Sequence, residues 1–130
     1  MASPVLPSPH KRLAWVGRSH EELLEFPELV RRSVGYALRF AQAGEKHGHA
    51  KPLKGYGGAG VLEVVENSDG ETYRAVYTVK FADFVYVLLC FQKKAKRGIE
   101  TPKSVLELIR QRLRLAQQIA DQIPPTESES

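Results

Sequence analysis

The feature that most constrains the fold is a set of three successive apolar segments between residues 60 and 92. They read GVLEVVE (60–66), ETYRAVYTV (71–79) and FVYVLLCFQ (84–92). The first two flank Asn67–Gly70, whose residues tolerate positive φ and favour a hairpin turn. The last two are nearly continuous apolar runs, as expected for central strands covered on both faces. The sequence therefore predicts three antiparallel strands.

A strand and two helices are predicted ahead of this sheet. Residues 11–18, KRLAWVGR, form a short apolar run typical of a strand. Ser19 and Glu22 have the spacing of a capping box, in which each side chain pairs with a backbone N–H of the first helical turn. Pro27 ends that helix and starts a second one, which Gly44 terminates. The second helix has one apolar stripe, formed by Val30, Val34, Ala37, Leu38 and Ala41.

A third helix is predicted near the end of the chain. Thr101 and Pro102 supply a cap residue and a first-turn proline. Its apolar stripe consists of Val105, Ile109, Leu113, Ala116, Ala120 and Ile123. We therefore expect an α+β fold (α/β in the broad sense) in one domain over residues 11–122. A disordered leader over 1–10 and a disordered tail over 123–130 are expected to flank it.

Charge and cysteine usage narrow the classes of function. The chain has 130 residues and a formal net charge of +4, which favours a polyanionic partner such as a nucleic acid. It has no run of about 18 apolar residues, so we expect neither a membrane helix nor a membrane partner. The single cysteine, Cys90, cannot form an internal disulfide, which favours a reducing compartment and predicts a cytoplasmic location.

The glycine-rich segment 45–60, EKHGHAKPLKGYGGAG, predicts a mobile connection. His47 and His49 have no accompanying cysteine or carboxylate pattern, so we predict no metal site there. GYGGAG lacks both the flanking strand and helix of a dinucleotide fingerprint and the final Lys-Ser/Thr of a P-loop. We therefore expect that the protein needs no cofactor.

Charged side chains interrupt the apolar strands, and the hairpin register decides which of them meet. If Lys80 lies opposite Val85, then Arg74 lies opposite Phe91. Lys93 is then the diagonal neighbour of Arg74 on the same face, roughly 7–8 Å away between Cα atoms. Two long basic side chains at this spacing can contact one ligand.

The other hairpin adds a carboxylate to this face. If Glu66 lies opposite Glu71, then Glu63 lies opposite Arg74, and Glu63, Arg74 and Lys93 form a cluster at one end of the sheet. Several positioned donors of this kind are what binding a phosphodiester requires. The alternative is that Glu63 and Arg74 form a surface ion pair worth under ~1 kcal/mol. The basic run that follows would then only keep a loop soluble.

Several motifs occur along the chain: WVGRS, FPELVRRSVGYALRFAQAG, KPLKGYGGAGVLEV, YRAVY, VYVLLCFQKKAK and TPKSVLELIR. Together with the order of elements, they resemble the RelE/HigB superfamily of bacterial toxins, in its branch of phage-derived toxin-like proteins. The resemblance runs from about Lys11 to Ala120. It implies a RelE-like fold, with an N-terminal strand and two helices packed on an antiparallel sheet, and a C-terminal helix. It also implies the toxin of a type II toxin–antitoxin system, neutralised by an antitoxin that is often a helix-turn-helix protein.

Many members of this superfamily cut mRNA in the ribosome without a metal ion. The implied reaction is attack of a ribose 2′-OH on the adjacent phosphate, which leaves a cyclic phosphate and a free 5′-OH. Such chemistry needs a base, an acid and cations for the developing charge. The resemblance thus implies an endoribonuclease, a hydrolase whose partners are mRNA and the ribosome. Arg110, Arg112 and Arg114 fit contacts to ribosomal RNA, but they equally fit a solvated helix face.

The resemblance also assigns roles to individual residues. Arg74, in YRAVY, supports the phosphate in the transition state, and Lys93, in FQKK, grips the RNA beside it. Lys54 is a candidate base, and Glu63 either orients Arg74 or transfers a proton. The residues implied to bind RNA are Lys51, Lys94, Lys96 and Arg97.

One position departs from the superfamily pattern. Many relatives have a histidine in the strand just before FQKK, where this chain has Leu89 in VLLCF. If that histidine is catalytic in this branch, the protein is slow, uses Tyr73, Tyr77 or a lysine instead, or binds without cleaving. Two other functions therefore stay open. One is a toxin-fold protein that acts by binding, such as a DNA gyrase inhibitor, and the other is a catalytically inactive RNA-binding or regulatory module.

Overall fold

The structure is a computed structural model that describes residues 10–56, 60–93 and 102–123. In these ranges the chain forms, in order, β1 (Arg12–Trp15), α1 (Ser19–Leu24), α2 (Glu28–Gln42), β2 (Ala50–Pro52), β3 (Val61–Ser68), β4 (Glu71–Thr78), β5 (Phe84–Lys93) and α3 (Lys103–Gln122). The strands make one sheet in the order β1-β5-β4-β3-β2. β1 runs parallel to β5, and every other pair is antiparallel. The predicted α+β fold is confirmed, and it is consistent with a RelE-like fold.

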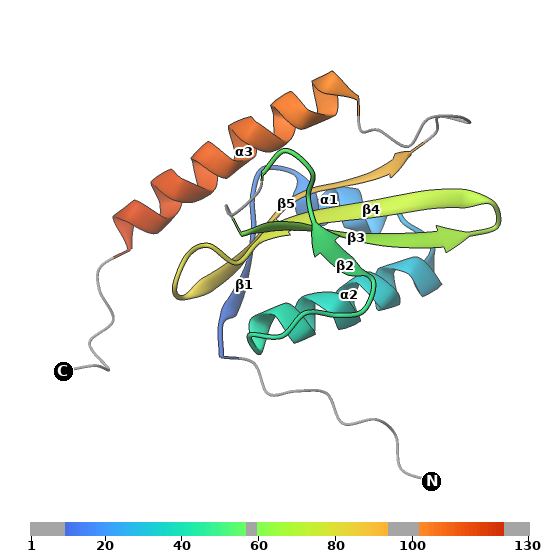
Figure 1. The fold of residues 1–130 in the computed structure, drawn as a ribbon, viewed down its shortest axis with the longest axis horizontal. Coiled ribbons are helices and arrows are strands. Elements are labelled where there is room, and N and C mark those ends of the chain that lie inside the picture. Colours follow the sequence, from blue (N-terminus) through green and yellow to red (C-terminus); the bar gives the residue numbers. More distant parts are fainter. Residues whose placement is uncertain (1–9, 57–59, 94–101, 124–130) are drawn as a thin grey trace, which may run out of the picture.

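Helices cover both faces of the sheet (Figure 1), with α3 on one face and α2 on the other. The predicted stripe of α2 is buried in full: Val30, Val34, Ala37, Leu38 and Ala41 all face the sheet. The stripe of α3 is confirmed except for Ile123, which follows the end of the helix: Ile109 and Ala116 are buried, and Val105, Leu113 and Ala120 pack beside them. The central strands β4 and β5 are therefore enclosed between two apolar layers, as their continuous apolar sequences predict.

The turn between β3 and β4 is shorter than the sequence suggests. We predict a four-residue turn over Asn67–Gly70, but β3 continues to Ser68, and only Asp69 and Gly70 form the turn, with φ of 52° and 78°. Two successive residues with positive φ are typical of a type I′ turn, whose twist matches that of the strands it joins. The predicted pairing of Glu66 with Glu71 is therefore wrong, because Ser68 lies opposite Glu71.

The second hairpin was predicted correctly at one end and incorrectly at the other. Arg74 does lie opposite Phe91. Lys80 does not lie opposite Val85, because the ladder at that end finishes with Thr78 opposite Tyr86. A β-bulge separates the two parts of the hairpin, which is why one register does not describe both.

The bulge inserts Leu88 as an extra residue of β5, because Val76 pairs with Leu89 and Tyr77 pairs with Val87. Side chains of a regular strand alternate between faces, so residues three apart lie on opposite sides. Because of the bulge, Val87 and Cys90 lie on the same face although they are three residues apart, and both belong to the apolar cluster beneath α1 and α2. It also places Leu88 and Leu89 together in the cluster beneath α3.

A largely buried ion pair, with the side chains of Arg112 and Glu22 11% and 22% exposed, joins α1, α3 and the bulge. Arg112 Nη1 donates to Glu22 Oε1 and to the Leu88 carbonyl, each at 2.9 Å, while its Nη2 lies 2.9 Å from Glu22 Oε2. Glu22 Oε1 also accepts from the Cys90 backbone N–H at 3.1 Å. The predicted capping box is therefore wrong. α1 does begin at Ser19, but it has no side-chain cap, and the Glu22 carboxylate is engaged in the core.

This pair also corrects the interpretation of the arginines of α3. Arg112 is buried, so it belongs neither to an RNA-contacting surface nor to a solvated helix face. Arg110 and Arg114 are exposed, and Arg110 pairs with Glu107 at 2.8 Å. The close approach of Arg112 also constrains Gly17, whose φ is 58°. A Cβ added there would lie 3.1 Å from Arg112 Nε.

We expect Arg112→Ala to lower the free energy of unfolding by about 3 kcal/mol, because it leaves the Glu22 carboxylate and the Leu88 carbonyl without their partner. Arg110→Ala is the matched control, since it removes an exposed ion pair worth under ~1 kcal/mol. Urea denaturation followed by circular dichroism measures both. Equal destabilisation by the two variants would contradict the role given to Arg112.

Cys90 supplies a second test of the packing. Burial, reinforced by the neighbouring Glu22 carboxylate, raises the pKa of the Cys90 thiol to about 12. Because the thiolate is the reactive form, alkylation at mildly alkaline pH should be slow in the folded protein. It should become as fast as that of a small thiol once urea unfolds the chain. Rapid labelling without denaturant would show that β5 is not enclosed as described.

Candidate functional site

Four neighbouring strands each place one charged side chain on the face of the sheet that α3 covers. These residues are Lys51 in β2, Glu63 in β3, Arg74 in β4 and Lys93 in β5. Lys51 lies directly opposite Glu63, Arg74 is diagonal to Glu63, and Lys93 is diagonal to Arg74. We call these four residues the charged stripe. Their backbone positions are fixed by the hydrogen-bond ladders of the sheet.

Glu63 and Arg74 form the centre of the stripe. Arg74 Nη1 donates to Glu63 Oε1 at 2.8 Å, and only 10% and 7% of the two side chains are exposed. The predicted direct pairing of Glu63 with Arg74 is wrong, because Val65 lies opposite Arg74. The predicted register is shifted by two residues, and because side chains alternate with a period of two, Glu63 still lies on the same face as Arg74. The ion pair is also buried and not a surface pair, so each charge depends on the other to offset its loss of hydration.

The two lysines border this pair from both sides. Lys51 is exposed and Lys93 is half-buried. The structure therefore brings Lys93 onto the same face as Arg74, and it adds Lys51, which the sequence associates with RNA binding. Three cations and one carboxylate along a rigid sheet give this face an excess of positive charge. Such a charge arrangement suits an anionic ligand that offers several oxygen atoms.

The other predicted site residues are not brought into the stripe. Lys54 is exposed in the turn after β2, beyond the last described backbone hydrogen bond between the two strands, from Leu53 N to Val61 O. No described contact joins it to Glu63 or Arg74. The predicted RNA-binding residues Lys94, Lys96 and Arg97 lie outside the described residues.

The stripe contains no tyrosine or histidine. Leu89, where many relatives have histidine, is 4% exposed and packs in the cluster beneath α3. Tyr73 and Tyr77 lie on the opposite face, in the cluster beneath α1 and α2. Burial raises the pKa of Tyr77 to about 12, which keeps its phenol neutral. These two tyrosines therefore pack in the core and do not supply a proton-transfer group to the stripe.

An ionisable pair that the sequence did not indicate lies at the open edge of the sheet. Part of the segment predicted to be a mobile connection forms β2, and this places His49, the residue just before the strand, next to Val65. His49 Nδ1 lies 2.8 Å from Glu66 Oε2. A three-residue strand that contains a proline has no periodic signal, so alternation of side chains could not have identified it. Among the described residues, no group of three His, Cys, Asp or Glu side chains could hold a metal ion.

The fold and the stripe together define an α+β protein with a row of charged side chains on one face of its sheet. A comparison with protein families assigns the chain to one of them. Residues 21–114 match the family described as phage-derived protein Gp49-like (DUF891), and the chain belongs to this family. The family is RelE/HigB-like and is associated with the toxins of toxin–antitoxin systems. A search of curated proteins found no match. None of the described helices has the length and apolar character required to cross a membrane.

The central ion pair predicts strong coupling between two substitutions. Glu63→Gln and Arg74→Gln should each destabilise the protein by about 3 kcal/mol, because each leaves a buried charge without its partner. The loss of unfolding free energy in the double variant should be at least ~1 kcal/mol smaller than the sum of the losses in the two single variants. Urea denaturation of all four proteins measures this coupling. Simple additivity would mean that the two side chains do not interact in solution.

Proposed function

We propose that this protein is the toxin of a type II toxin–antitoxin pair and that it cuts mRNA as a metal-independent, ribosome-dependent endoribonuclease. The observation that carries the proposal is the charged stripe. When a 2′-OH attacks its neighbouring phosphate, negative charge grows on the phosphate oxygens. Cations held on a rigid sheet stabilise that charge without having to reorganise. The association of the Gp49-like family with toxins supports the same function.

Each member of the stripe has a role in this proposal. Arg74 supports the phosphate in the transition state, and Glu63 holds the guanidinium in place through the 2.8 Å hydrogen bond. Lys51 and Lys93 bind the phosphates on either side. Lys54, which is exposed after β2, is also proposed to bind RNA, as are Lys94, Lys96 and Arg97. The partner that neutralises the toxin is proposed to be a helix-turn-helix antitoxin.

The test is regulated expression in a bacterial host, followed by mapping of RNA 5′ ends. We expect growth arrest and cuts at fixed codon positions in translated mRNA. Arg74→Ala should reduce cutting at least ~100-fold, as loss of one transition-state donor does in other enzymes. Arg18→Ala removes an exposed arginine outside the stripe, and it should cut like the wild-type protein.

Arg74→Lys is a control for unfolding. It keeps a positive charge beside Glu63, so the protein should stay folded, but it lacks the planar set of donors of the guanidinium. Circular dichroism of both Arg74 variants shows whether the protein remains folded. A folded Arg74 variant with full cutting activity would contradict the proposed role of the stripe.

The buried position of Leu89 favours a second candidate, in which the fold binds its target without cleaving it. The same expression experiment distinguishes the two. Intact transcripts together with relaxed plasmid DNA would indicate gyrase inhibition. Intact transcripts without a growth effect, but with RNA binding that weakens as salt is raised, would indicate a regulatory RNA-binding module.

A further inference from the structure

We propose that the imidazole of His49, oriented by the carboxylate of Glu66, removes the proton from the attacking 2′-OH. This inference rests on the proposed RNA cleavage and supplies a group that the charged stripe lacks. His49 comes from the turn just before β2, and Glu66 comes from β3, at the edge of the sheet where β2 is the last strand.

The geometry of the pair suits proton transfer. The Glu66 side chain is 11% exposed, whereas the His49 side chain is 60% exposed, and 2.8 Å separates Glu66 Oε2 from His49 Nδ1. A carboxylate in this position accepts the Nδ1 proton, which leaves Nε2 with a lone pair. A histidine oriented by a buried carboxylate in this way can take a proton from a hydroxyl group at Nε2.

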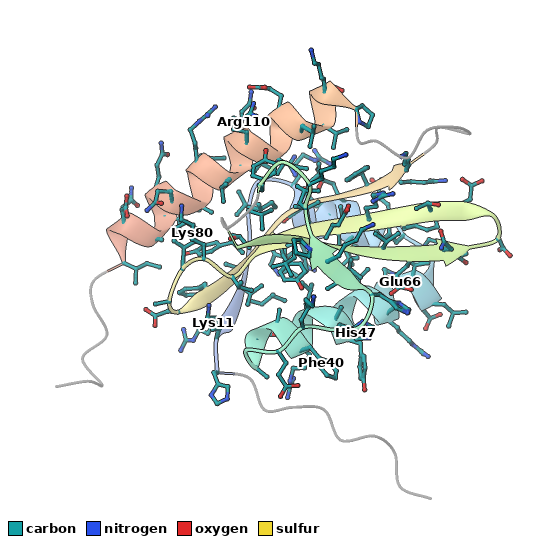
Figure 2. All side chains as sticks on the ribbon, in the orientation of Figure 1. Lys11, Phe40, His47, Glu66, Lys80 and Arg110 are labelled. Atoms are coloured by element: carbon teal, nitrogen blue, oxygen red, sulfur yellow. The ribbon has the colours of Figure 1, made fainter. Side chains whose placement is uncertain are left out.

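Contacts on both sides hold the backbone of His49 in place. Its carbonyl accepts from Val65 N at 3.3 Å, and its N–H donates to His47 Nδ1 at 3.0 Å. The His47 ring packs edge-on against Tyr36 and Phe40 of α2, each at 5.6 Å between ring centroids. Figure 2 shows His47, Glu66 and Phe40 on the side of the sheet where α2 lies. The His49 imidazole is therefore exposed, while the backbone of His49 is held by hydrogen bonds.

Two hollows in the surface meet at His49 and Glu66. One, of about 460 Å³, is also lined by Lys51, Val65 and Asn67. The other, of about 300 Å³, is also lined by Arg32, Ser33, Tyr36 and His47. Each hollow contains one exposed cation, Lys51 or Arg32. An RNA chain lying along the two hollows would bring a phosphodiester to the imidazole between them.

The larger hollow also continues into the charged stripe. Lys51 belongs to both, and Val65, in the wall of the hollow, lies opposite Arg74 in the neighbouring strand. RNA held by Lys51 can therefore be approached from His49 on one side and from Arg74 and Lys93 on the other. The ionisable groups that line the two hollows with His49 are Glu66 from β3, Lys51 from β2, Arg32 and Tyr36 from α2, and His47 from the segment before β2.

The proton balance of the step is as follows. His49 Nε2 takes the 2′-OH proton while the 2′ oxygen forms a bond to phosphorus, and the bond from phosphorus to the 5′ oxygen breaks. The departing 5′ oxygen takes a proton from water. The resulting hydroxide accepts the proton held by His49, which returns to its neutral form. The products are a 2′,3′-cyclic phosphate and a 5′-OH, with no proton gained or lost.

The experiment measures the cutting rate of the purified protein on ribosome-bound mRNA between about pH 5 and pH 8, where a histidine changes its charge. Compared with the wild-type protein, His49→Ala should lower the rate about 100-fold and flatten the pH profile, as loss of a general base does. Added imidazole should restore part of the lost rate. His49→Gln should fail in the same way although its amide can still donate to Glu66, so that a folding defect in the alanine variant cannot explain the result.

Two further variants complete the design. His20→Ala is the matched control, because His20 is an exposed histidine that packs on Trp15 of β1, the opposite edge strand. It should cut like the wild-type protein at every pH. Glu66→Gln tests a positioning residue, since Glu66 orients His49 without contacting RNA. It should lower kcat about 10-fold and leave KM unchanged.

The outcomes separate this inference from the function on which it rests. Wild-type cutting together with a folded His49→Gln variant of unchanged rate and pH profile would overturn the role of His49 and leave the endoribonuclease in place. A wild-type protein that cuts no RNA in the ribosome would overturn both. An equal loss of activity in His20→Ala would also overturn the inference, because it would show that the effect does not depend on the Glu66 pair.

Discussion

The ion pair between Glu22 and Arg112 is the contact on which the arrangement of helices and sheet depends. Its two residues are far apart in the chain, in α1 and α3, and both of them bind backbone groups of β5. Burying two charges costs several kcal/mol unless their geometry is good and their remaining hydrogen bonds are made. Here the guanidinium binds both carboxylate oxygens and a carbonyl, so the pair connects one helix from each face through the strand between them.

The bulge at Leu88 links this contact to the site. A bulge removes ladder hydrogen bonds locally. At this bulge the Leu88 carbonyl accepts a hydrogen bond from the Arg112 guanidinium instead. Beyond the bulge the register brings Phe91 opposite Arg74, and Lys93 follows on the same face. Without the extra residue, one half of β5 would present its apolar side chains to the wrong helix. The position of Lys93 thus depends on a contact made several residues away, in the core.

The sequence predicts those parts of the structure that depend on local periodicity. The stripes of α2 and α3, the three long strands and the face shared by Glu63, Arg74 and Lys93 all follow from residue spacing. The register was wrong by two residues in one hairpin, because NSDG is compatible with both a four-residue and a two-residue turn. The ion pair between Glu22 and Arg112 could not be predicted, because a contact between residues far apart in the chain leaves no periodic pattern in the sequence. The His49–Glu66 pair was missed for the same reason.

β2, one of the two edge strands of the sheet, has a consequence for the behaviour of the protein at high concentration. An exposed strand edge offers unpaired N–H and C=O groups to any other chain, and long flat edges promote aggregation. β2 has only three residues, one of which is Pro52, which lacks an N–H, and another is the exposed Lys51. A second copy can therefore gain few main-chain bonds there. The edge remains accessible to solutes, yet it is a poor template for intermolecular sheet growth.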